Sequence, residues 1–196
     1  MISIEEMISD AHVTLFARSF VGLVMLMAGV PKLLDISRFV EIVRGYQLLP
    51  GRIVNWVGRL LPIWEIVIGL ALLANIFRFW AALSALCLFL VFCGAILTNL
   101  MRGRSYIPCG CFGVSKDHEL SWKLVMRSGF LGGMAVLALP ILPSPGDATL
   151  LSIPETALTL LIAAAAVEGW WLSGVILDIW RLPNPLDELQ QIDTRN

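Results

Sequence analysis

Five apolar runs, each close to the length needed to cross a bilayer, constrain the fold of this chain more than any other feature. A transmembrane helix takes roughly 20 consecutive apolar residues. The chain is 58% hydrophobic and 15% charged, whereas soluble domains are about one quarter charged. Because backbone groups cannot stay unpaired in lipid, the runs should form helices. The runs cover residues 13–30, 53–74, 79–100, 122–142 and 153–180.

We therefore predict an all-α integral membrane protein, with one helical-bundle domain over residues 1–181 and a polar tail over residues 182–196. The connection Asn75–Arg78 is very short, which makes the second and third spans antiparallel neighbours. The segment Ile36–Leu49 carries apolar residues at helical spacing with charged residues between them. This pattern predicts an amphipathic helix that either lies on the membrane surface or caps the bundle. The alternative is an ordinary polar loop.

The basic residues predict an orientation for the bundle. With five spans, the segment Ile36–Leu49, the loop between the third and fourth spans and the C-terminal tail share one side of the membrane. Arg78 is the one basic residue between spans on the opposite side. By the positive-inside rule, the more basic side faces the cytoplasm. Its basic residues are Lys32, Arg38, Arg44, Arg52, Arg102, Arg104, Lys116, Lys123, Arg181 and Arg195.

The loop between the third and fourth spans contains the string Cys-Gly-Cys-Phe-Gly, which begins at Cys109. Cys109 and Cys111 can close into a disulfide only as a strained ring, and strained disulfides are the reducible kind. Arg102 and Arg104 could stabilise a thiolate, and His118 could carry a proton. We interpret the pair as a redox dithiol. A pair of inert loop thiols or a simple loop clamp is the first alternative. A metal site is the second, although it supplies only three ligands where structural zinc takes four.

Two acids, Glu65 and Glu168, fall inside predicted spans, where a carboxylate is costly enough to suggest a function. They could form a proton path or line a pocket for a quinone or substrate. The alternative is that each joins neighbouring helices by hydrogen bonds. Arg59 and Arg127 are the expected ion-pair partners. A quinone is the one cofactor left open, because the chain has neither a phosphate-binding glycine loop nor a haem-attachment motif.

Two further cysteines, Cys87 and Cys93, lie inside the third predicted span. Buried free cysteine usually behaves as a small apolar residue, and we predict that role for both. The alternative is that Cys93 passes electrons to the loop pair.

Several strings together resemble one family, the MauE proteins of methylamine utilisation, within the wider DoxX-like group. The resemblance covers roughly Arg18 to Leu139, and the Cys-Gly-Cys-Phe-Gly string is its most specific part. The strings are Ala28–Leu33, Tyr46–Pro50, Pro62–Glu65, Arg102–Arg104, Cys109–Gly113 and Trp122–Arg127.

The resemblance implies a DoxX-like antiparallel bundle with about five spans in the bacterial inner membrane. It implies a thioredoxin-like partner of the MauD type and a client such as the small subunit of methylamine dehydrogenase, in which disulfides form. Cys109 and Cys111 would be the redox pair, and Glu65 the family's intramembrane acid. Maturation of that client is periplasmic, which conflicts with the cytoplasmic side that the charges predict for the loop.

Two other functions stay open. The chain could be a non-catalytic accessory or assembly subunit of a larger membrane complex, with its amphipathic segment and tail as docking surfaces. By analogy with other DoxX-like proteins, it could instead be a quinone-reducing subunit, with Glu65 and Glu168 lining the quinone pocket. Lipid and protein are the expected partners, and nucleic acid is not.

Overall fold

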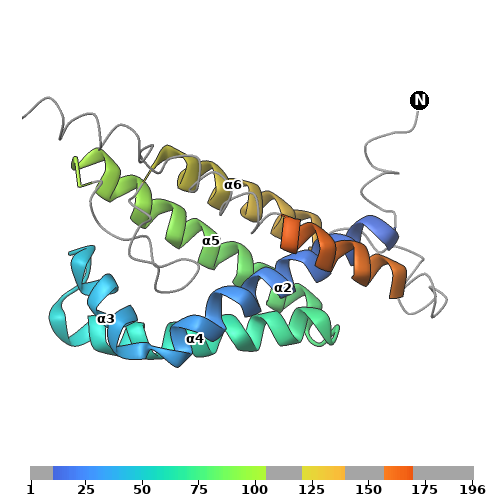
Figure 1. Cartoon of the computed structure of the whole chain (residues 1–196), viewed down its shortest axis with the longest axis horizontal. Helices are drawn as coiled ribbons and strands as arrows, with labels where there is room; N and C mark the ends of the chain where they lie inside the picture. Colours follow the sequence, from blue (N-terminus) through green and yellow to red (C-terminus); the bar gives the residue numbers. More distant parts are fainter. Residues whose placement is uncertain (1–10, 105–120, 140–156, 170–196) are drawn as a thin grey trace, which may run out of the picture.

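A computed structural model describes residues 11–104, 121–139 and 157–169 of the chain. Helices make up nearly all of this part, and it contains no strand (Figure 1). The all-helical prediction is therefore confirmed for the described residues. The helices are α2 (Ala11–Leu34), α3 (Ile36–Gly45), α4 (Gly51–Leu73), α5 (Arg78–Met101), α6 (Trp122–Leu137) and a short apolar helix, Ala157–Gly169.

Three of these helices are long and apolar enough to cross a membrane: Val13–Leu34, Gly51–Leu73 and Arg78–Met101. They correspond to the first three predicted spans. The fourth and fifth predicted spans reach beyond the described residues, since α6 has 16 residues and Gly169 is the last described residue of the fifth predicted span. The five-span arrangement thus stays a prediction.

Helices α2 and α4 run antiparallel and touch through glycines. A Cβ atom added to Gly69 of α4 would lie 2.8 Å from the carbonyl oxygen of Gly22 in α2. One added to Gly29 of α2 would lie 3.1 Å from the carbonyl oxygen of Pro62 in α4. Small residues are the usual means by which membrane helices approach this closely.

A single main core joins α2 and α4 to α5, α6 and the short helix Ala157–Gly169. In Figure 1, α5 and α6 lie side by side above the pair formed by α2 and α4. Fully buried members of the core include Val21, Leu72, Ala82, Ala85, Ala135 and Ala163.

Helix α3 caps the bundle, which is one of the two positions that the sequence left open for the amphipathic segment. Its apolar residues Phe39 and Ile42 are buried, and Val40 lies directly against α4. A Cβ atom on Gly58 of α4 would be 2.6 Å from Cγ2 of Val40. The Asp35 side chain begins the helix by accepting a hydrogen bond from the backbone N–H of Arg38.

The turn between α4 and α5 is as short as predicted and makes these helices antiparallel neighbours. Asn75 and Phe77 adopt left-handed backbone angles there, with φ of 58° and 49°. Asparagine is one of the residue types that tolerate this region. The buried Arg18 of α2 donates a hydrogen bond to Oδ1 of Asn75, which ties this turn to the first helix.

Candidate functional site

The described part of the bundle contains one ion pair, between Lys32 of α2 and Glu65 of α4. Nζ of Lys32 donates to Oε1 of Glu65 at 2.6 Å and to Oε2 at 2.8 Å. Both side chains are only 1% exposed. Glu65 lies about 21 Å along α4 from its first residue, at 1.5 Å per residue. The pair is thus well inside a helix that is long enough to span a bilayer.

The close approach of α2 and α4 explains how this pair forms. Gly29 of α2 lies against Glu65, since a Cβ on Gly29 would be 3.2 Å from Cβ of Glu65. Lys32 follows Gly29 by three residues and therefore lies on the same face of α2. Helical side chains lean toward the N-terminus of their helix. The Lys32 side chain consequently runs back along α2 to the level of the carboxylate.

Two aromatic rings enclose the Lys32 ammonium group. Nζ lies 5.1 Å from the ring centre of Phe39 in α3 and 5.0 Å from that of Phe92 in α5. Both distances are within the range of cation–π attraction. One lysine side chain thereby contacts groups from three other helices, and the rings help to keep water from the pair.

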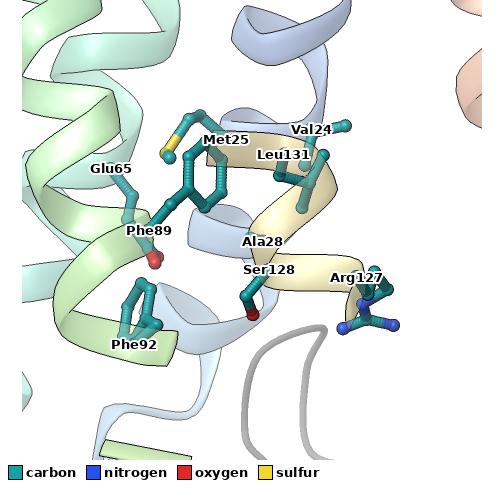
Figure 2. A pocket seen from close by; sticks show the side chains of 9 residues that line it. All are labelled: Val24, Met25, Ala28, Glu65, Phe89, Phe92, Arg127, Ser128 and Leu131. Atoms are coloured by element: carbon teal, nitrogen blue, oxygen red, sulfur yellow. The ribbon is translucent and has the colours of Figure 1, made fainter. Parts of the chain in front are cut away.

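A small cavity of about 20 Å³ adjoins Glu65, with room for about one water molecule. Figure 2 shows the carboxylate between Phe89 and Phe92, with Ser128 of α6 on the opposite wall and Arg127 pointing outward. Pockets for organic ligands usually measure about 300–1,000 Å³, so this cavity is much smaller than a quinone site. Its lining is mostly apolar, and Glu65, Arg127 and Ser128 are the polar residues among it.

The predicted redox pair, Cys109 and Cys111, lies outside the described residues, as does His118. The redox role of these residues therefore stays a prediction from the sequence. The flanking residues are described. Arg102 is exposed at the end of α5, and Nη1 of Arg104 donates to Oε1 of Gln47 at 2.6 Å.

The two helix ends that adjoin residues 105–120 lie together at the α3 end of the bundle. Ile96 near the end of α5 is 1% exposed and packs with a cluster of neighbours. These neighbours come from the end of α5, the start of α6 and the residue after α3: Leu100, Leu124, Val125 and Tyr46. The α3 end is thus also the end from which the cysteine-bearing segment leaves and returns.

The second predicted acid does not belong to this site. Glu168 is exposed in the helix that is described over Ala157–Gly169, and no described contact joins it to Glu65. The prediction of Arg59 as a partner of Glu65 was wrong, because Arg59 is exposed on another face of α4. Arg127 lines the cavity beside Glu65, but the ion pair is made by Lys32.

Sequence reasoning missed Lys32 because it counted this residue among the charges outside the spans. A lone lysine in the last turn of one apolar run, with a lone glutamate deep in the next, is the signal that could have found it. The role predicted for the two cysteines of α5, that of small apolar residues, stays a prediction. Cys87 is exposed on the outer surface and Cys93 is partly buried, and both are free thiols.

Helices long enough to span a bilayer, joined by an ion pair buried among them, define a helical membrane protein. Comparison with known families then makes the assignment specific. The family described as "Methylamine utilisation protein MauE" matches residues 10–142. The chain therefore belongs to the MauE family, as the sequence motifs indicated.

The chain also matches curated relatives over most of their length. The chain is 37% identical to a methylamine utilization protein MauE of Methylophilus methylotrophus over 165 residues, which cover 84% of this chain and 85% of the relative. It is 33% identical to the protein of the same description from Paracoccus denitrificans, over 76% of this chain and 79% of the relative. The protein of Methylorubrum extorquens is also 33% identical, over 83% and 90%. No solved structure matches the chain.

Proposed function

We propose that this protein is a multi-pass protein of the bacterial inner membrane that takes part in methylamine utilisation through thiol–disulfide exchange at Cys109 and Cys111. Its family and the relatives described as methylamine utilization proteins support the pathway. The observation that carries the exchange chemistry is the Cys-Gly-Cys-Phe-Gly string between α5 and α6. The packed ends of these two helices hold both flanks of that segment close to α3.

The proposed thiol–disulfide exchange conserves atoms and electrons without a bound cofactor. A client thiolate attacks one sulfur of a Cys109–Cys111 disulfide, so that this S–S bond breaks and a mixed disulfide forms. A second client thiolate attacks the mixed disulfide, which releases the client with its own disulfide and leaves both loop cysteines reduced. A thioredoxin-like partner in its disulfide form then accepts the two electrons by the reverse exchange. The small subunit of methylamine dehydrogenase is the proposed client.

The buried ion pair has a supporting role in this proposal. Lys32 contacts Glu65, Phe39 and Phe92 and so fixes α2, α3, α4 and α5 relative to one another. Arg104 links the last residues before the cysteine segment to Gln47 beside α3. These contacts would hold one flank of the cysteine segment close to α3.

The test is the redox state of the client in cells that carry Cys109→Ser, Cys111→Ser or both changes. Alkylation of free thiols followed by a gel-shift assay should show reduced client accumulating in each variant. Cys87→Ser, which removes an exposed thiol of α5, is the matched control and should leave the client oxidised. Normal client oxidation in the double variant, at wild-type levels of this protein, contradicts the proposal. Copurification of a stoichiometric complex with both cysteines dispensable would point instead to a non-catalytic assembly subunit.

A further inference from the structure

Three arginines and a tryptophan gather on the outer surface where α3 meets α4. Nη2 of Arg44 in α3 donates to Oδ1 of Asn55 in α4 at 3.2 Å, in an exposed position. Arg52 and Arg59 lie three residues before and four residues after Asn55, so they flank it on the same strip of the helix. Trp56 follows Asn55 and is 70% exposed. We name Arg44, Arg52 and Arg59, with Trp56, the arginine patch.

The position of Arg59 calls for a physical explanation. This residue is exposed, yet it lies about 12 Å along a helix that is long and apolar enough to cross a membrane. The same outer surface continues with exposed apolar side chains, Leu60, Ile63 and Trp64. A charged group facing hydrocarbon is costly unless it reaches the headgroup region. Arginine can do so by extending its side chain toward the helix start, which here brings it toward Arg52.

Neither the Arg52 nor the Arg59 side chain makes a hydrogen bond or an ion pair within the part of the chain that the structure describes. Acids are also scarce nearby. Helix α4 has no acidic residue before Glu65, and Glu65 is bound to Lys32. In α3, Glu41 is exposed near Arg44, while the Asp35 carboxylate caps the helix. The arginine patch therefore carries a net positive charge.

We propose that the arginine patch binds the phosphate of an anionic phospholipid. Guanidinium groups pair bidentately with phosphate oxygens, and an indole favours the interface between headgroups and acyl chains. The exposed apolar side chains that continue along α4 would contact the acyl chains of the same lipid. This continuity favours a lipid over a free phosphate or an acidic peptide, because those ligands offer nothing to cover Leu60 and Ile63. A zwitterionic lipid fits less well, since its own cation offsets the phosphate.

The test is native mass spectrometry of the full-length protein in detergent, titrated with phosphatidylglycerol and, separately, with phosphatidylcholine. A basic group near a membrane surface contributes about fivefold to anionic-lipid affinity. Arg59→Gln should therefore weaken phosphatidylglycerol binding about fivefold, and Arg52→Gln with Arg59→Gln roughly 25-fold. Phosphatidylcholine binding should change little. Arg59→Lys should keep part of the affinity, because it keeps the charge but loses the bidentate geometry.

Lys123→Gln is the matched control, since Lys123 is an exposed cation in the first turn of α6 and should leave phosphatidylglycerol binding unchanged. Equal binding of the two lipids by the wild type, or wild-type affinity in the double variant, overturns the proposal. Displacement of phosphatidylglycerol by millimolar glycerol phosphate also overturns it, because that result defines a free-phosphate site. All the substituted residues are exposed, so unchanged thermal unfolding midpoints are expected and confirm that each variant is folded.

Discussion

Lys32 and Glu65 lie 33 residues apart in the chain, yet Nζ of the lysine is 2.6 and 2.8 Å from the two carboxylate oxygens. Lipid tails are as apolar as the helices they surround, so the hydrophobic effect does little to fix one membrane helix against another. Direct polar contacts and close packing must do so instead. Here the ion pair and the rings of Phe39 and Phe92 connect four helices at one level.

We expect Lys32→Met to lower the free energy of unfolding by about 3–5 kcal/mol, because the Glu65 carboxylate would stay buried without its partner. Unfolding in mixed micelles by increasing denaturing detergent measures this loss. The double variant Lys32→Met with Glu65→Met should recover most of the stability, since it buries no unpaired charge. A double variant that is less stable than either single variant would contradict the coupling.

The contact between α3 and α4 predicts that Gly58→Ala displaces the capping helix. The new Cβ would lie 2.6 Å from Cγ2 and 3.1 Å from Cα of Val40, and such overpacking costs about 1–3 kcal/mol. Limited proteolysis should cut near α3 faster in this variant than in the wild type. Gly94→Ala is the control, because a Cβ there meets no atom within 4 Å, and it should leave the cleavage rate unchanged.

Gly69→Ala should separate α2 from α4. Its Cβ would lie 2.8 Å from the backbone oxygen of Gly22, which cannot move aside without moving the helix. A loss of about 1–3 kcal/mol in the free energy of unfolding is expected. Gly133→Ala, at an exposed position of α6 with no atom near the added Cβ, serves as the comparison. Equal effects of the two changes would show that the glycine contact does not hold α2 and α4 together.

Two substitutions of Asn75 separate the contributions of its left-handed backbone angle and of its hydrogen bond with Arg18 to stability. Asn75→Gly keeps the left-handed backbone but removes the acceptor for Arg18, which should cost about 1–3 kcal/mol because a buried donor loses its partner. Asn75→Ala should cost about 1–2 kcal/mol more, since its Cβ disfavours positive φ. Thermal unfolding of the two variants measures the difference. Identical stabilities would mean that the backbone angle carries no strain.

The proposed exchange with a periplasmic client predicts which side residues 105–120 face. In a Cys87→Ala, Cys93→Ala background, a membrane-impermeant maleimide should label intact cells only after prior reduction. That outcome would show an outward-facing disulfide and overrule the orientation predicted from charge. The Lys32 charge is already balanced by Glu65, which removes one residue from the charge argument. Labelling that requires permeabilised cells would place the pair in the cytoplasm and contradict the proposed exchange with a periplasmic client.

Several features followed from the sequence alone. Apolar runs of bilayer length predicted three helices within a few residues of their ends. The reason is that a helix makes its backbone hydrogen bonds within one segment, as lipid requires. The spacing of Phe39 and Ile42 predicted α3 and its apolar face. The helix ends at Gly45, earlier than the predicted Leu49, and Gln47 beyond it has a φ of 49°, which a helix does not allow. The family also followed from motifs in the sequence.

Only the tertiary structure decided which helix faces meet. Periodicity identifies the buried side of each helix but does not say which neighbour covers it. Six residues separate Arg59 from Glu65, which on a helix of 3.6 residues per turn places them on different faces. This spacing argues against Arg59 but cannot select Lys32. Lys32 reaches Glu65 because Gly29 lets α2 approach α4 to backbone contact, and that approach depends on two segments far apart in the sequence.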